Sequence, residues 1–211
     1  MKVAILCESD TDEAAVRILV SALLKEPADA VLRPSLRSGG WSAVKNALSA
    51  VLRDVHYCTD AEALAIIVDS DDSPIHDAAH DEPHVAVGRC RTCQLREIIA
   101  RTQLKPRPHG NPVKVAVAVA VPAIEAWYRC SRDEHNNERE WSKQLAALGN
   151  MREQRLALKR QVYGSETPPR QHALQRATEE ATRLAPDLDV LKRQFPAGFG
   201  LFAEQIASWK A

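Results

Sequence analysis

The sequence lacks an apolar run long enough to cross a bilayer, and Met1 and Lys2 lead straight into a strand-like segment without the pattern of a secretory signal. These absences predict a protein that neither spans a membrane nor carries an export signal. The five cysteines are odd in number and scattered, so we expect no disulfide framework. We therefore predict a protein of the reducing cytoplasm.

Net charge is also absent, because 28 Lys and Arg residues balance 28 Asp and Glu residues. Bulk charge thus gives no sign of nucleic-acid binding. The chain contains neither a Walker-type Gly-rich loop nor a local Ser/His/Asp or Cys/His signature, so no motif assigns it to those nucleotide-binding or nucleophilic classes. Its 211 residues suffice for one sizeable domain, or for a core domain with a helical appendage.

Charge is nevertheless distributed unevenly. Residues 54–82 contain no Lys or Arg, and their acidic residues are Asp54, Asp60, Glu62, Asp69, Asp71, Asp72, Asp77, Asp81 and Glu82. The stretch that follows is opposed only by Glu97, and its basic residues are Arg89, Arg91, Arg96, Arg101, Lys105, Arg107 and Lys114. Adjacent acidic and basic blocks favour a metal-binding centre beside a track for a polyanion, and oppositely charged solvated faces are the alternative.

Short apolar segments alternate with segments of helical periodicity. The expected strands are residues 3–9, 30–36, 63–69 and 113–121, and the expected helices between them are residues 12–24, 41–55 and 93–104. This alternation predicts an α/β fold with a central, mostly parallel four-stranded sheet flanked by helices. We assign residues 1–135 to this core and residues 136–211, which contain only helix-like segments and loops, to a C-terminal helical extension packed on it.

Acidic residues follow three of the expected strands. They are Glu8, Asp10, Asp12, Glu13, Asp69, Asp71, Asp72 and Glu125. Because the carboxyl ends of parallel strands share one edge of a sheet, we expect these side chains to meet there and to bind Mg²⁺ or Mn²⁺, which prefer carboxylate oxygens. The alternatives are helix capping by Asp10, Asp12 and Glu13, and a simple turn at residues 69–71.

The acidic motifs resemble the TOPRIM domain of topoisomerases, primases and overcoming-lysogenization-defect (OLD) nucleases. The matching segments are "ESDTD" (8–12), with Ser9 where Gly is usual, and "DSD" (69–71). The wider pattern is similar to a stand-alone bacterial TOPRIM-like family related to the OLD-type nuclease domain. Its further matching segments are "VPAIEAWY" (121–128), "RQVYG" (160–164) and "FPAGFGLFAEQI" (195–206). The resemblance implies a Rossmann-like TOPRIM fold over nearly the whole chain.

The resemblance also implies roles for the acids. Glu8 would be the general acid/base or a metal ligand, and Asp69 and Asp71 would be metal ligands. Glu125 would correspond to the additional catalytic acid of the nuclease branch. Supporting candidates are Asp12 for catalysis and Asp72 for the metal. Carboxylates of this kind hold one or two Mg²⁺ ions that polarise a phosphodiester and generate hydroxide.

Basic residues are candidates for holding the phosphates of a nucleic acid. The set that we favour is Lys159, Arg160, Arg89 and Arg91, and further candidates are Arg96, Arg101, Arg152, Arg155 and Arg170. Solvation of helix surfaces is the alternative for any single one of them. Trp41 is a candidate for base stacking, whereas we expect Trp127, Cys7 and Cys130 to be buried in the core.

A second kind of metal site is also present as a pattern. His76, His80 and His84 recur at a spacing of four residues, and Cys90 and Cys93 form a C-x-x-C motif. Neutral imidazole and thiolate are the ligands of structural zinc. A zinc site built from His80 or His84 with Cys90 and Cys93 is therefore an alternative to a purely carboxylate centre.

The leading hypothesis is a Mg²⁺-dependent TOPRIM-type nuclease that cleaves DNA or RNA, and the resemblance implies a role in defence against mobile elements. One alternative is a haloacid-dehalogenase-like phosphatase, because "IIVDSDD" (66–72) resembles the hhhhDxDx strand end of that family, with Asp69 as the nucleophile. The other is a non-catalytic module whose acidic edge binds a metal or a partner protein encoded nearby. A homodimer is compatible with each hypothesis.

Overall fold

The computed structural model describes residues 1–28, 39–82, 88–107 and 111–210. In this part of the chain, three parallel strands form one sheet in the order β1-β2-β3: β1 (Val3–Leu6), β2 (Ala63–Asp69) and β3 (Lys114–Ala120). The predicted α/β class with a parallel sheet is confirmed. The expected strand at residues 30–36 lies outside the described residues, so the sheet has three described strands where four were predicted.

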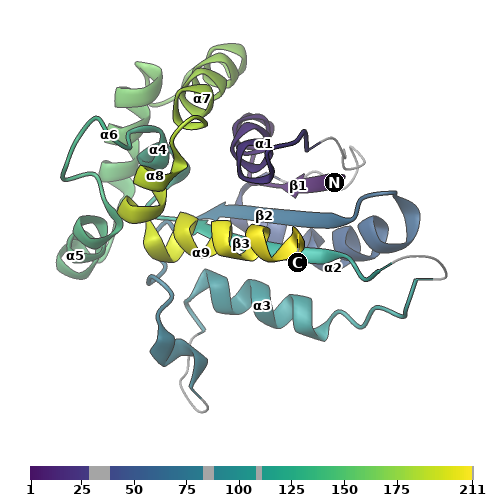
Figure 1. Ribbon diagram of the computed structural model, residues 1–211. Coiled ribbons are helices and arrows are strands. Elements are labelled where there is room, and N and C mark those ends of the chain that lie inside the picture. The colour runs from purple at the N-terminus through teal and green to yellow at the C-terminus, as the bar shows by residue number, and fades with distance from the viewer. Residues whose placement is uncertain (29–38, 83–87, 108–110, 211) are drawn as a thin grey trace.

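Helices cover both faces of the sheet and its carboxyl end (Figure 1). The long helices between the strands are α1 (Asp10–Leu24), α2 (Gly40–Cys58) and α3 (Arg91–Arg101). After β3 come α4 (Ile124–Tyr128), α5 (Glu138–Leu148), α6 (Arg152–Tyr163), α7 (Arg170–Leu184), α8 (Leu188–Gln194) and α9 (Leu201–Ala207). Short turns of other helix types are η2 (Ala78–Asp81), η3 (Pro196–Gly200) and η4 (Ser208–Lys210).

The alternating side chains of the strands sort into two cores. On one face, the larger residues of β2 and β3, such as Ile66 and Val119, pack with the buried residues of α2 and α3. On the other face, alanines such as Ala65 and Ala118 pack with α1, α7 and α9. The Val/Ala alternation of β3 therefore reflects a strand covered on both sides, as the sequence predicted.

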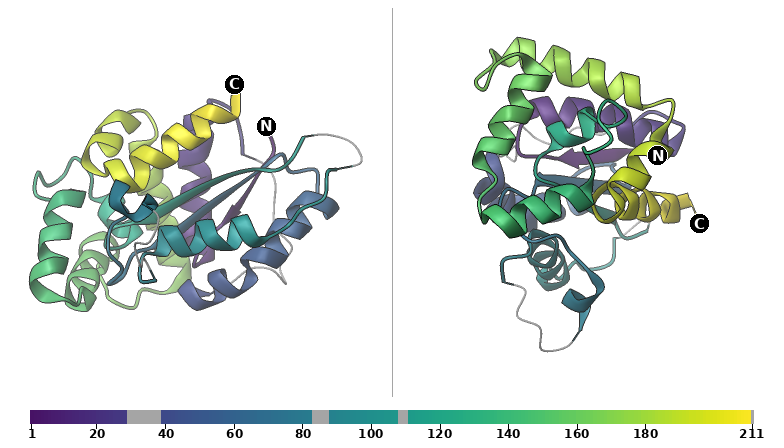
Figure 2. Two further views of the ribbon diagram at one scale, coloured as in Figure 1. Left: turned by 90° about the horizontal axis from the view of Figure 1, so that it is seen from below. Right: turned by 90° about the vertical axis from the view of Figure 1, so that its left-hand side faces the viewer.

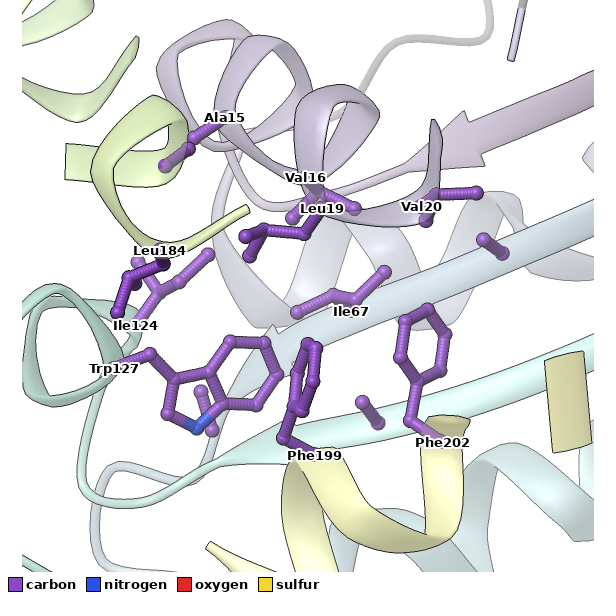
Figure 3. Packing of buried hydrophobic residues seen from close by; sticks show 14 of the residues in the cluster. Ala15, Val16, Leu19, Val20, Ile67, Ile124, Trp127, Leu184, Phe199 and Phe202 are labelled. Carbon is purple, nitrogen blue, oxygen red and sulfur yellow. The ribbon is translucent and has the colours of Figure 1, made fainter. Parts of the chain in front are cut away.

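Aromatic side chains fill the space that the alanines leave (Figure 3). Trp127 and Phe199 are fully buried, with ring centroids 5.2 Å apart in an edge-on arrangement. Phe202 lies beside Phe199 on the same core face. Trp127 is thus a core residue, as expected, and the C-terminal helices share one hydrophobic core with the sheet rather than forming a separate one.

The observed element ends differ from the predicted ones where capping residues intervene. Strand β1 ends at Leu6, so Glu8 lies in the connection to α1. Helix α1 begins at Asp10 because Ser9 is its N-cap: the Ser9 hydroxyl accepts the Asp12 amide at 3.1 Å. Helices α2 and α3 likewise begin one and two residues before the predicted positions 41 and 93.

Helix α9 runs beside β3, the last strand of the sheet in the described part of the chain (Figure 2). The Gln205 side chain of α9 accepts the Val117 amide at 3.0 Å and donates to the Val117 carbonyl at 3.1 Å. None of the described helices is long and apolar enough to cross a bilayer. All five cysteines carry free thiols, and Cys7 and Cys130 are buried as expected.

Candidate functional site: a cavity lined by carboxylates

Acids from three connections meet at the carboxyl end of the sheet. Glu8 and Asp12 follow β1, Asp69 ends β2, and Glu125 lies in α4 just after β3. These four carboxyl groups line one cavity of about 280 Å³, which we call the carboxylate cavity. Its other lining residues are Ser9, Thr11, Gly40, Lys159, Tyr163, Pro168 and Ala173. Figure 2 (right) views this end of the molecule, where α5, α6 and α7 lie in front of the sheet.

Glu8 is held by the backbone around it. Its Oε1 accepts the amide of Asp69 at 3.0 Å. The Glu8 carbonyl accepts the amide of Gly40 at 2.9 Å. Gly40 has a φ of +72°, a left-handed conformation that glycine adopts without the steric cost of a side chain. The start of α2 therefore fixes Glu8 beside the end of β2.

Asp12 and Asp69 are each anchored through one oxygen. Asp12 Oδ2 accepts the Ser9 hydroxyl at 2.7 Å, and Asp69 Oδ1 accepts the amide of Ile124 at 2.9 Å. The bond to Ile124 ties the end of β2 to the first turn of α4. Asp69 thus positions the helix that carries Glu125 as well as contributing an acid of its own.

Glu125 is the most buried of the four acids, with 4% of its surface exposed. The side chain of Tyr163, from α6, lines the same cavity and influences the pKa of this carboxyl group. Glu125 Oε2 is buried and has no hydrogen-bond partner among the described residues. A buried carboxylate oxygen without a partner costs free energy, so this atom requires a bound proton, water or cation.

Burial and mutual repulsion raise the pKa values of all four acids. Burial raises the pKa of Glu125 to about 7 and that of Asp12 to about 6, and each is partly offset by the nearby Lys159 ammonium. Burial, followed by the charges of Glu125, Asp12 and Glu8, raises the pKa of Asp69 well above its usual range. Burial also raises the pKa of Glu8, although the Arg91 guanidinium opposes this shift. The cavity therefore favours bound protons or a bound cation.

Asp71 and Asp72 do not line the carboxylate cavity. Asp71 has a left-handed backbone, with φ of +51°, which turns its side chain toward Arg91 and Arg155, and it pairs with both guanidinium groups. Asp72 Oδ1 accepts the amide of Met151 at 2.7 Å. These contacts place Asp71 and Asp72 in a different hollow from Glu8 and Asp69, and the metal-binding roles predicted for them stay predictions.

The remaining acids of the first connection lie outside the cavity lining. Asp10 forms an ion pair with Arg170 of α7, and Glu13 pairs with Arg17 one turn along α1 at 3.0 Å. Their positions in the first turn of α1 also suit the helix dipole, which was the alternative interpretation of these residues. The same alternative is not sufficient for Asp12, because its side chain reaches the cavity.

A second polar hollow, of about 600 Å³, is lined in part by Asp71 and Asp72, and we call it the arginine hollow. Its lining residues are Trp41, Asp71, Asp72, Ser73, Gly88, Arg89, Arg91, Gln94, Gly149 and Arg155. Arg91 connects it to the carboxylate cavity, because its guanidinium contacts Glu8 Oε1 at 3.4 Å and the Asp69 carbonyl at 2.6 Å. The guanidinium also lies 4.7 Å from the centroid of the Trp41 ring.

The other predicted phosphate-binding residues are spread over the surface. Lys159 lines the carboxylate cavity and Arg89 the arginine hollow, whereas Arg160 pairs with Glu166 at 3.2 Å. The further candidates Arg96, Arg101 and Arg170 are paired with Asp81, Glu97 and Asp10 respectively. Sequence reasoning did not place Tyr163 in the site; its signal was the spacing of four residues from Lys159, which puts both side chains on one face of α6.

The histidine and cysteine pattern forms a group of its own. Donor atoms of His76, His80, Cys90 and Cys93 all lie within 4.8 Å of one another. His84, the other histidine considered in this pattern, lies outside the described residues. The group therefore contains His76 and His80 together with both cysteines.

A hollow larger than the carboxylate cavity, of about 640 Å³, lies beside α5. Its lining includes Glu138, whose two carboxylate oxygens accept the amides of Ala197 at 2.6 Å and Gly198 at 2.8 Å. That carboxylate is occupied in joining α5 to η3 and is not available for a ligand.

Comparisons of the chain with protein-family models, curated proteins and solved structures found no match. The TOPRIM resemblance of the sequence motifs therefore stays a prediction.

Proposed function

We propose that the protein is a Mg²⁺-dependent phosphodiesterase of TOPRIM type that cleaves nucleic acid. The observation that carries this proposal is the carboxylate cavity, where acids from three separate connections meet around the unpartnered Oε2 of Glu125. A set of carboxylate oxygens fits Mg²⁺ or Mn²⁺ in donor chemistry, and a cation would satisfy the buried oxygen and relieve the repulsion that raises the four pKa values.

Glu8, Asp69 and Glu125 would hold the cation, which would supply Lewis-acid activation of a phosphodiester and of water. The residues of the chain would do the rest. Glu8 has a raised pKa and a fixed Oε1, so it is suited to take up and return a proton. Lys159 lies where its ammonium can meet a phosphate oxygen, and Tyr163 lines the cavity with Glu125.

The arginine hollow supports a nucleic-acid substrate rather than a small phosphomonoester. It lies next to the carboxylate cavity, is shared through Arg91, and combines guanidinium groups with the Trp41 ring. Cationic side chains that follow a backbone and an aromatic ring for a base are features of single-strand binding. The phosphatase alternative is less well supported, because the hhhhDxDx motif normally ends the first strand of its family, whereas Asp69 ends β2 and follows β1 in the chain.

The proposal is tested by incubating the protein with supercoiled plasmid, single-stranded DNA and single-stranded RNA. We expect cleavage of at least one substrate with Mg²⁺ or Mn²⁺ and none after chelation. Glu8→Gln keeps a carbonyl acceptor for the Asp69 amide and should lose the activity. Cleavage by Glu8→Gln at the wild-type rate, or no cleavage of any substrate with either cation, would contradict the proposal.

Substitution of Arg89 should weaken nucleic-acid binding without affecting the fold. Arg89 is exposed and lines the arginine hollow. We expect Arg89→Ala to weaken binding and to reduce the slope of log affinity against log salt by about one unit, because one phosphate contact is lost. Binding is measured by fluorescence anisotropy at several salt concentrations, with Ca²⁺ in place of Mg²⁺.

The matched control is Arg101→Ala, which removes an exposed arginine of the same basic stretch that pairs with Glu97 away from the hollow. It should leave both the affinity and the salt slope unchanged. Equal effects of the two substitutions would show that binding depends on general charge and not on the arginine hollow.

A further inference from the structure

The His76, His80, Cys90 and Cys93 group lies where two short segments meet. Asp77 caps η2 by accepting the Ala79 amide at 2.9 Å, and this turn brings His80 back toward His76. Cys90 is the N-cap of α3, and Cys93 follows in its first turn. The start of α3 therefore places both thiols beside the two histidines.

The separations between donor atoms are close to those of a tetrahedral site. His76 Nδ1 lies 3.4 Å from Cys93 Sγ and 3.8 Å from Cys90 Sγ, and His80 Nδ1 lies 4.0 Å from Cys93 Sγ. Ligands at usual Zn–S and Zn–N bond lengths in a tetrahedron are about 3.3–3.8 Å apart. Small side-chain rotations therefore bring all four donors to bonding distance of one ion.

The surroundings of His76 also suit a metal ligand. Its Nε2 lies 3.4 Å from the Asp81 carboxylate, which is placed to accept a proton held at that nitrogen and to leave Nδ1 for the metal. Arg96 contacts the same Nε2 at 2.8 Å and Asp81 at 3.1 Å. When Nε2 carries a proton, Arg96 keeps its partner in Asp81, so metal binding requires only a local turn of that guanidinium.

Two members of the cluster are buried. Cys90 is 1% exposed and His76 is 9% exposed, whereas His80 and Cys93 are half-buried. This group of two histidines and two cysteines differs from the carboxylate cavity in both its ligands and its place in the fold.

We propose that His76, His80, Cys90 and Cys93 bind one structural Zn²⁺ ion, which would cross-link the connection after β2 to the start of α3. Nitrogen and sulfur donors select zinc over Mg²⁺. The ion would hold the first turn of α3, where Arg91 lies between the two cysteines and contacts Glu8 and Asp71. Ser73 holds the same turn by accepting the Arg91 amide at 3.0 Å. The zinc would therefore position the arginine that joins the carboxylate cavity to the arginine hollow.

The test begins with the metal content of the purified, reduced protein, measured by mass spectrometry of the elements. We expect one zinc per chain, retained on dialysis and released by a strong chelator with a fall in the unfolding temperature. Cobalt added to the metal-free protein should produce the visible absorption of tetrahedral Co²⁺ and a thiolate charge-transfer band. Cys93→Ser should lose both signals, whereas Cys58→Ser, at an exposed free cysteine, should keep them.

Asp81→Asn provides a milder variant in case loss of a ligand prevents folding. It leaves all four ligands in place and should weaken zinc binding by about 10- to 100-fold, because the partner of His76 is altered. Retention of zinc by Cys93→Ser, iron with sulfide in place of zinc, or metal-free protein after growth with added zinc would overturn the proposal. None of these readouts depends on nuclease activity.

Discussion

Asp69→Asn should abolish cation-dependent cleavage while leaving the protein at least as stable as the wild type in the absence of metal. The loss of activity follows because the amide has no negative charge with which to hold a cation, and we expect the rate to fall by about 10²- to 10⁴-fold. The stability is retained because the asparagine carbonyl can still accept the Ile124 amide. The substitution also removes the carboxyl group that is repelled by Glu125, Asp12 and Glu8.

This combination of effects distinguishes a functional acid from a structural one. Cleavage rate and the free energy of unfolding are measured on the same preparation, the latter by urea denaturation with a chelator present. Asp10→Asn is the matched control. Asp10 also lies just beyond the carboxyl end of a strand, β1, but it pairs with Arg170 outside the cavity lining. Activity retained by Asp69→Asn would contradict its role in holding the cation, and unfolding at much lower urea than the wild type would show that Asp69 is primarily a structural residue.

Without divalent cations, the protein should lose stability as the pH rises from about 4 to above 7, and Mg²⁺ should restore it mainly at the upper end of this range. The folded-state pKa values are about 6 for Asp12 and about 7 for Glu125, each above the ordinary value of its side chain. Between the ordinary and the raised values, the folded protein binds more protons than the unfolded chain. The free energy of unfolding therefore falls with rising pH over this interval, by a few kcal/mol in total.

Calorimetry at a series of pH values, with and without Mg²⁺, measures this effect. Other groups also titrate in this range, including His76, whose lowered pKa acts in the opposite direction. Comparison with Glu125→Gln separates the contributions, because that variant should show a shallower pH dependence and a smaller gain from Mg²⁺. Identical pH profiles for Glu125→Gln and the wild type would contradict the electrostatic account of the cavity.

Much of the fold and part of the site could be predicted from the sequence. Apolar strands that alternate with amphipathic helices specify a parallel sheet, and strand ends then place Glu8, Asp69 and Glu125 at one edge. The direction of Asp71 could not be predicted, because it depends on one left-handed backbone conformation that turns the side chain toward Arg91 and Arg155. Spacing alone treats Asp69 and Asp71 as a pair, whereas the turn separates them.

Contributions from distant segments were equally beyond local patterns. Tyr163 reaches Glu125 only because α6 packs against α4, a contact between segments that no short motif specifies. The choice of His76 and His80 likewise depends on the η2 turn, whose geometry is set by the Asp77 cap. Periodicity gives the elements, but these residues depend on how the connections fold back on the sheet.

The two hydrogen bonds between Gln205 and Val117 oppose association of the protein with further copies of itself. A terminal strand with unsatisfied amides and carbonyls invites a strand from another chain to add to the sheet, which is a common route to aggregation. At Val117, a side-chain amide occupies both backbone groups as a neighbouring peptide would. Strand addition at this position therefore requires α9 to move away from β3, so detachment of this helix should promote aggregation.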